Sequence, residues 1–357
     1  MRRASVLFAA AFAVAAILTG SALAAGPVGT TQLIAGGSAG LAGSSGTAST
    51  TGSLSTEIPG LEVDEDVPNS GMSAARVPSS GVPTPAGNAV IGTGLELTTG
   101  FPGLNHFDER TAGTGIYTNT NFSLEPPDQA LCVGGGKVIE GVNTAFRVYN
   151  ENGTAAGSVT AYNQFYGVTP AINRTTGVRG AFLSDPKCIY DAPSGRFIMS
   201  ILEAGQKPAG GFDGTGGIYF AVSAPNDTTS WSVYHFATDH DGANATSTGC
   251  PCLGDQPLIG ADANGIYFSV NSFPFFANGF NGAWVYAISK SALYNSPSGA
   301  ITVLKYWGGP LRDGLSYSIQ PATSPGTTFA TANSGTEYSC QRSTSTRRST
   351  TRSRSGI

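Results

Sequence analysis

The chain has 357 residues, of which 40% are hydrophobic and 12% charged, and its formal net charge is −4. Five Arg and no acidic residue lie in residues 339–357; without them and the two Arg near the N-terminus, 12 basic residues remain against 23 acidic ones, a net charge of −11. This acidic body argues against nucleic acid as a partner and favours cations or basic surfaces.

Residues 1–24 have the pattern of a secretory signal peptide. Arg2 and Arg3 precede an apolar stretch from Val6 to Leu18, and Ala22-Leu23-Ala24 is a small-residue cleavage site. The stretch is too short for a spanning helix, and no later run is long enough. The sequence therefore predicts a secreted or cell-surface protein with no membrane span.

Residues 25–103 consist mostly of Gly, Ser, Thr, Ala and Pro. Such a segment buries too little apolar surface to offset the loss of chain entropy on folding. We expect a disordered stalk here, followed by a folded domain over residues 104–338.

A short motif recurs along that domain, as Asp128-Gln-Ala-Leu, Asp185-Pro-Lys-Cys and Asp255-Gln-Pro-Leu, and Ile319-Gln-Pro-Ala begins a fourth copy. The residue that follows each Asp lies at position 129, 186 or 256, and Gln320 holds the same place in the fourth copy. The steps between these positions are 57, 70 and 64 residues. Repetition on this scale indicates one supersecondary unit used several times. The predicted units are residues 128–184, 185–254 and 255–319, with a partial unit at 320–338.

Each unit contains short runs rich in aromatic and β-branched residues, separated by turn signals. In the second unit the runs are Lys187–Asp191, Arg196–Leu202, Ile218–Ser223 and Ser232–Phe236. Four short antiparallel strands per unit are typical of a β-propeller blade. We predict an all-β fold, a truncated β-propeller-like array of antiparallel four-stranded blades; a β-sandwich is the alternative.

Residues 339–357 change abruptly to Ser, Thr and Arg. Three interpretations are open: a basic arm, a disordered tail without a role, and the product of a reading-frame error. Codons can be chosen so that restoring one base after Tyr338 yields an apolar, strand-like run. We favour the frame error, because Cys340 in the tail also makes the cysteine number odd. We expect residues 339–357 to be disordered.

Asp128, Asp185 and Asp255 are the candidate catalytic residues, since the motif places them at one position of successive units. In a propeller they would face one mouth of the channel, where a raised-pKa acid beside an ionised partner could hydrolyse glycosides. The competing interpretation is that each Asp hydrogen-bonds the backbone of a turn, and recurrence in every unit favours it.

Asp239, Asp241 and Asn244 alternate as oxygen donors in a Gly-containing loop, which loosely resembles the start of a calcium site. No acidic residue completes the loop as an EF-hand requires; an ordinary Asp- and Gly-rich loop is the alternative, and calcium is the one cofactor that the sequence suggests.

Cys132, Cys188, Cys250 and Cys252 are an even set that favours two disulfides in an exported protein, with Cys340 free. A ring closed between Cys250 and Cys252 would be tight, so we expect each of them to bridge elsewhere. The exact connectivity cannot be deduced from the sequence.

The runs Pro127–Cys132, Phe182–Asp191 and Cys250–Asp262 resemble a group of exported bacterial β-propeller-like proteins of unassigned function. The resemblance covers Leu124 to Tyr338. It implies secretion, blades, and a chain that continues past this C-terminus, and it implies no catalytic residues.

These patterns predict a secreted propeller-like protein that binds a glycan or a protein at the cell surface or in a matrix. The alternative is a glycan-processing enzyme that uses the acidic residues at the mouth of the propeller.

Overall fold

The computed structural model describes residues 29–41, 100–124, 127–240, 249–295, 301–311, 314–323, 337–343 and 353–354. The predicted signal peptide and most of the predicted stalk lie outside these ranges. In the part of the chain that is described, no helix is long and apolar enough to cross a membrane.

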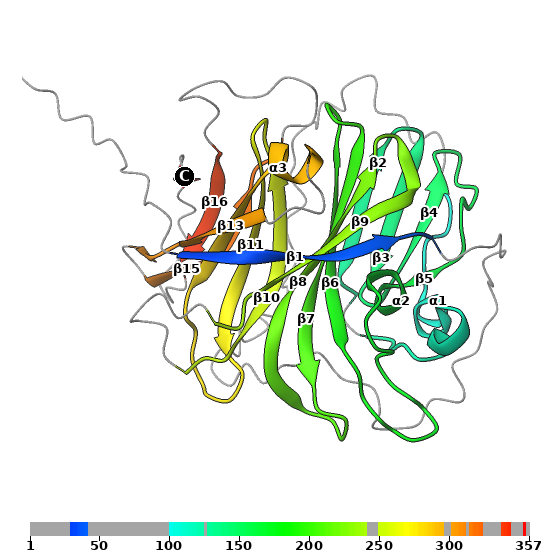
Figure 1. The fold of residues 1–357 in the computed structure, drawn as a ribbon, viewed down its shortest axis with the longest axis horizontal. Helices are drawn as coiled ribbons and strands as arrows, with labels where there is room; N and C mark the ends of the chain where they lie inside the picture. The colour runs from blue at the N-terminus through cyan, green and yellow to red at the C-terminus, as the bar shows by residue number, and fades with distance from the viewer. Residues whose placement is uncertain are drawn as a thin grey trace, which may run out of the picture.

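The main element is a nine-stranded antiparallel sheet (Figure 1). Its two outer strands contact each other, so the sheet curls into a nearly closed, barrel-like form. In spatial order its strands are β10 (Cys252–Ala261), β11 (Gly265–Pro274), β12 (Ala283–Ser289), β13 (Ile301–Trp307), β1 (Gly29–Ala39), β9 (Asp227–Ala237), β8 (Phe212–Ala224), β7 (Arg196–Gln206) and β6 (Phe182–Asp191).

Two small four-stranded sheets accompany the large one. The first contains β2 (Gln129–Gly134), β3 (Lys137–Val142), β4 (Ala145–Asn150) and β5 (Thr160–Ala161). The second contains β14 (Pro310–Leu311), β15 (Gly314–Pro321), β16 (Ser339–Ser343) and β17 (Ser353–Arg354). The helical segments are α1 (His106–Thr111), a 3₁₀ turn (Gly115–Tyr117), α2 (Tyr162–Tyr166) and α3 (Lys290–Asn295).

The all-β class is confirmed, but the propeller prediction is wrong. Strands β6–β9 and β10–β13 form two antiparallel meanders over the predicted runs. They are not separate blades, because β1 pairs with both and joins them into one sheet. In Figure 1, β1 crosses the middle of the molecule between the two halves.

β1 comes from a segment in which composition predicts a disordered stalk. Gly29–Leu33 pairs with β13, and Ile34–Ala39 pairs with β9 after a bulge at Ala35 and Gly37. A Cβ on Gly36 would lie 3.1 Å from Val233 Cγ1, so the missing side chain permits the close approach to β9. Small residues thus form this strand through edge pairing rather than through burial of large side chains.

The predicted tail also contributes a strand. β16 starts at Ser339 and pairs with β15, where the partial fourth unit was expected to have its second strand. The expectation of disorder after Tyr338 is therefore wrong for Ser339–Ser343. The structure does not describe residues 344–352.

The largest core lies inside the curled sheet and draws on both meanders. Phe220 of β8 contacts Phe268 of β11 with ring centroids 5.0 Å apart, and Phe236 of β9 contacts Tyr286 of β12 at 4.9 Å. These rings are fully buried. Aromatic burial of this kind contributes to stability beyond its area alone.

A disulfide between Cys132 and Cys188 links β2 of a small sheet to β6 of the large one. The two residues are 56 positions apart. In the chain-entropy account, closing such a loop stabilises the fold by roughly 4 kcal/mol. A second disulfide joins Cys250 and Cys252 and spans only 2 positions, for which the same account gives less than about 2 kcal/mol.

Removing β1 should destabilise the large sheet. A chain that begins at residue 42 would leave the edges of β9 and β13 unpaired and would lose the burial of Leu33, a loss of at least about 2 kcal/mol. Thermal unfolding should show a lower midpoint than for a chain that begins at residue 29. Equal midpoints would contradict the joining role of β1.

Replacing both Cys132 and Cys188 with Ser should lower the free energy of unfolding by roughly 2–5 kcal/mol. The matched control replaces Cys250 and Cys252, whose short loop predicts a smaller loss. Denaturant unfolding of the two double variants compares them directly. A larger loss in the control would contradict the cross-linking role assigned to Cys132–Cys188.

Candidate functional site

A cavity of about 300 Å³ lies among β2, β6, β10 and β15. β6 contacts β2 and β10, and β10 contacts β15. The lining mixes apolar side chains with polar ones and includes Gln129, Leu131, Lys187, Leu258, Gln320 and Thr323. Such a mixture of apolar walls and a few hydrogen-bonding groups is typical of ligand sites.

The recurring motif builds a β-bulge in three of these four strands. In β6 the register shifts between Ser184 and Lys187, in β10 between Asp255 and Leu258, and in β15 between Tyr317 and Gln320. The first bulged residue has a positive φ each time, at Asp185 (56°), Gln256 (46°) and Ser318 (48°). The motif thus bends each strand within its paired length.

The bulges correct the alignment of the three candidate carboxylates. Asp185 is the first bulged residue of β6, the position that Gln256 holds in β10. Asp255 is one residue earlier and corresponds to Ser184. Asp128, in an Asp-Gln-Ala-Leu run, corresponds to Asp255. Only two of the three carboxylates therefore share an equivalent position.

Asp128 and Asp255 lie close enough for their charges to interact. Burial raises the pKa of Asp255 to about 6, the backbone N–H of Gln256 opposes this shift, and the charge of Asp128 adds to it. Asp128 itself is half-buried, and its backbone N–H donates to Asn143 Oδ1 at 3.1 Å. The pair thus combines a carboxyl of raised pKa with a neighbouring carboxylate.

Asp185 differs from this pair. It is 5% exposed, and Ser184 Oγ donates a hydrogen bond to its Oδ1 at 3.2 Å. Asp185 lies within the bulge of β6, and the turn-stabilising interpretation of the motif stays a prediction.

Lys187, Leu258 and Gln320 directly follow the bulge of their strands, Leu131 corresponds to Leu258 in the Asp-Gln-x-Leu motif, and all four line the cavity. Gln320 thus aligns with Leu258 rather than with Gln256, which corrects the alignment of the fourth copy. Lys187 Nζ donates to the backbone oxygen of Pro186 at 3.1 Å. The ring of four side chains thus has two apolar members, one amide and one cation.

The cysteines pair as Cys132–Cys188 and Cys250–Cys252, and Cys340 is free. Two disulfides with Cys340 unpaired confirm the predicted number. The expectation that Cys250 and Cys252 each bridge elsewhere is wrong. Their Cα atoms are 4.5 Å apart, within the range that a disulfide spans, so the short ring can close.

The predicted calcium loop is only partly described, since Asp241 and Asn244 lie outside the described residues. The side chain of Asp239 accepts hydrogen bonds from Gly216 N at 3.4 Å and pairs with His240 Nδ1 at 2.9 Å. Within the described ranges, no group of three His, Cys, Asp or Glu side chains could hold a metal ion.

A further polar group on three adjacent strands was not predicted. Glu203 of β7 pairs with His235 of β9, with Oε2 and Nε2 2.8 Å apart. Tyr219 of β8 packs on the His235 ring with centroids 4.4 Å apart. Burial and the charge of Glu203 raise the pKa of Tyr219 to about 12. No sequence motif predicts the contacts among Glu203, Tyr219 and His235, because each is an isolated polar residue in an apolar strand.

Comparisons with protein-family models, curated proteins and solved structures found no match to this chain. The resemblance to exported propeller-like proteins therefore stays a prediction, and the assignment of function depends on the geometry alone.

The raised pKa of Asp255 predicts a pH-dependent stability. Its value is 3.8 in the unfolded chain and about 6 in the folded one, so the folded state binds more protons between these values. The contribution of this group to stability is therefore lost as the pH rises from about 4 to about 6. Denaturant unfolding over this range should show that Asp255→Asn gains stability relative to the parent as the pH rises.

Asp128→Asn is the matched variant for Asp255→Asn. It removes the charge that helps raise the pKa of Asp255, so the pH range over which stability changes should become narrower. Glu337, whose pKa burial raises to about 7, contributes equally to all three proteins. If the free energies of unfolding of the parent and Asp255→Asn change in parallel with pH, the raised pKa assigned to Asp255 is contradicted.

Proposed function

We propose that the protein is an exported, non-catalytic binding protein that holds one sugar residue of a surface or matrix glycan in the cavity among β2, β6, β10 and β15. The observation that supports this most directly is that Leu131, Lys187, Leu258 and Gln320, from four different strands, all line the cavity. The cavity volume of about 300 Å³ is at the lower end for ligand pockets and suits a single sugar ring.

The chemistry of the lining suits a sugar. Gln129 and Thr323 offer donors and acceptors for hydroxyl groups, and Leu131 and Leu258 offer apolar surface for ring C–H groups. Gln320 Nε2 donates to the backbone oxygens of Ile259 and Pro321, so this residue offers its Oε1 as an acceptor. Lys187 is the cation in this lining, which favours a sugar that bears a carboxylate or sulfate. Two disulfides are consistent with an oxidising compartment.

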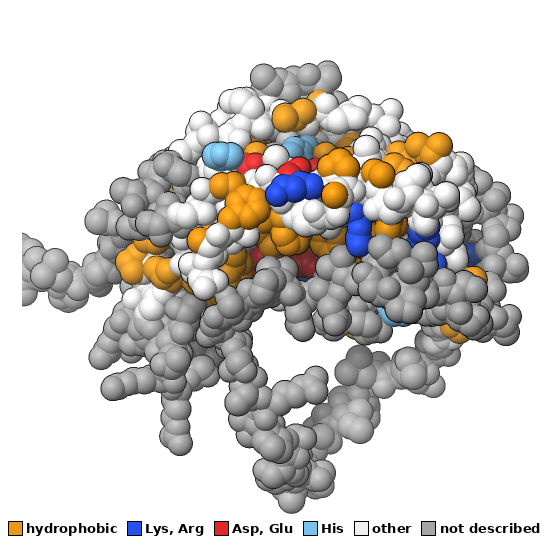
Figure 2. Space-filling view, turned by 90° about the horizontal axis from the view of Figure 1, so that it is seen from below, with side chains coloured by type: hydrophobic (Ala, Val, Ile, Leu, Met, Phe, Trp, Pro, Cys, Tyr) orange, Lys and Arg blue, Asp and Glu red, His pale blue; other side chains and the backbone are white. Residues whose placement is uncertain are grey.

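One face of the molecule has a similarly mixed surface. Figure 2 shows hydrophobic side chains gathered over the face seen from below, with basic and acidic side chains among them. A surface of this composition suits contact with a glycan chain or a protein.

Binding to a panel of neutral and acidic glycans tests the proposal. Leu131 is 65% exposed, so Leu131→Trp should fill the cavity without disturbing the core and should abolish binding. Val133→Trp is the matched control, because Val133 is exposed on the same strand and does not line the cavity. Lys187→Gln should weaken binding of acidic glycans at least tenfold, about 1.4 kcal/mol, the lower end for a charge-assisted hydrogen bond.

If Leu131→Trp and Val133→Trp lose the same amount of glycan affinity, the cavity is not the binding site. Binding of neutral and acidic glycans with equal affinity would overturn the role of Lys187.

A second candidate, glycoside hydrolysis, is favoured by one observation. Asp255 has a pKa of about 6 beside the carboxylate of Asp128, the combination that a general acid and its partner require. Turnover of a glycan that Asp255→Asn abolishes and Asp185→Asn preserves would establish it. Asn tolerates positive φ, so Asp185→Asn is a fair control.

A further inference from the structure

The disulfide between Cys250 and Cys252 is poorly explained by stability. It encloses only Pro251 and links no two elements, since Cys252 is the first residue of β10. A cross-link over so short a loop removes little freedom from the unfolded chain. Cys132–Cys188, which joins two sheets, provides the contrast within the same molecule.

The two sulfur-bearing residues have different environments. Cys250 is half-buried, whereas Cys252 is 0% exposed. An external thiolate can therefore approach the Cys250 side of the bond more readily than the Cys252 side. Thiol–disulfide exchange depends on which sulfur is accessible to attack and on how well the other leaves.

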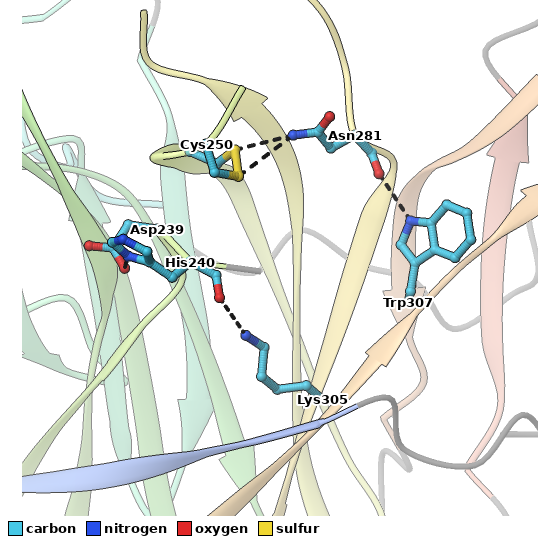
Figure 3. Close-up of a disulfide and its surroundings, with 7 residues drawn as sticks. Asp239, His240, Cys250, Asn281, Lys305 and Trp307 are labelled. Atoms are coloured by element: carbon cyan, nitrogen blue, oxygen red, sulfur yellow. Dashed lines mark hydrogen bonds and ion pairs between the residues drawn. A yellow bond between two sulfur atoms is a disulfide. The ribbon is translucent and has the colours of Figure 1, made fainter. Parts of the chain in front are cut away.

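Asn281 is aimed at the sulfur that would leave. Its Nδ2 lies 3.1 Å from Cys252 Sγ and 3.8 Å from Cys250 Sγ (Figure 3). The residue is held in place because Trp307 Nε1 donates to its backbone oxygen at 3.0 Å and its own N–H donates to Ser272 O at 2.8 Å. An amide donor so placed stabilises a thiolate on Cys252.

The backbone around the disulfide is anchored on both sides. The N–H of Cys252 donates to Asp239 O, and the N–H of Phe275 donates to Pro251 O, each at 2.9 Å. These bonds do not depend on the disulfide, so the two thiols should remain close after reduction.

We propose that Cys250–Cys252 is a redox-active disulfide that oxidises pairs of exposed thiols on other molecules. A substrate thiolate attacks Cys250 Sγ; the Cys250–Cys252 bond breaks, and Cys252 leaves with the electron pair as a thiolate hydrogen-bonded to Asn281. The second substrate thiolate then attacks the substrate sulfur of the mixed disulfide and releases Cys250 as a thiolate. The substrate loses two electrons and becomes a disulfide, and the protein gains them as a dithiol.

The surroundings favour a polypeptide as the thiol donor. Phe276 is 60% exposed, and both Phe276 and Pro251 pack over Gly214, where a Cβ would lie 2.9 Å from Pro251 Cγ and 3.0 Å from Phe276 Cε2. Lys207 Nζ lies 5.8 Å from the centroid of the Phe276 ring. An apolar surface with a cation at its margin thus adjoins the half-buried Cys250.

The two native disulfides provide the first test within one protein. The full chain with Cys340→Ser, which removes the exposed free thiol, is incubated with a dithiol peptide or with glutathione, quenched by alkylation and mapped by peptide mass. Cys250–Cys252 should open at least tenfold faster than Cys132–Cys188, with formation of one peptide disulfide per protein. Equal rates, or a slower Cys250–Cys252, would overturn the proposal. Faster opening by the peptide than by glutathione supports a polypeptide substrate, and the reverse order would overturn that part.

Single variants test the direction of attack and the role of Asn281. In Cys252→Ser the free Cys250 thiol should react with the disulfide form of the peptide, giving a mixed disulfide and one released peptide thiol, at least tenfold faster than Cys252 does in Cys250→Ser. Asn281→Leu should slow opening at least tenfold near neutral pH and shift its pH profile upward. Asn278→Leu, in the same loop, is the control. An unchanged pH profile in a folded Asn281→Leu protein would exclude Asn281 as the positioning residue.

Discussion

The pairing of β1 with both β13 and β9 is the constraint on which the rest of the structure depends. Each meander of the large sheet is built from local hairpins, but neither local pairing nor turn chemistry determines how the two meanders meet. β1 determines how the meanders meet, because one half of this strand pairs with β13 and the other half pairs with β9. The resulting curl brings the outer strands β6 and β10 into contact and encloses the aromatic core around Phe220, Phe236 and Phe268.

The same curl creates the place where β2, β6, β10 and β15 converge. Repeated bulges bend three of these strands at the same point, so equivalent side chains face a shared space. The composition of the ring, rather than its geometry, gives the cavity chemical character, because Lys187 is charged where its counterparts are leucine or glutamine. Asp128 and Asp255, which hold equivalent positions in the first and third units, also lie close enough for their charges to interact.

Local features of this fold could be predicted from the sequence, and long-range features could not. The runs Arg196–Leu202, Ile218–Ser223 and Ser232–Phe236 form strands because alternation and turn signals are local properties. β1 was missed because Gly29–Ala39 lacks aromatic residues, and its stability comes from edges of strands far along the chain. The propeller was predicted because four-stranded units look alike in sequence whether they stack as blades or join edge to edge.

The candidate site shows the same division. Asp128 and Asp255 were recognised from their motif, but Asp185 was misaligned by one residue, because a bulge shifts register without a sequence gap. The Cys250–Cys252 pairing was missed because only the bend of the backbone brings those Cα atoms to 4.5 Å. Glu203 and His235 are 32 residues apart in sequence, so no motif joins them.

The position of β1 in the sheet also sets an order of events during synthesis. β1 emerges from the ribosome first, yet β9 begins at Asp227 and β13 at Ile301, so its two partners do not exist until most of the chain has been made. The two meanders can form as they appear, whereas the strand between them has to remain unpaired and available. Closure of the sheet through β1 therefore has to wait for the synthesis of β13, and contacts between residues so distant in sequence form slowly in general. Until that step, both meander edges are open to pairing with a neighbouring chain.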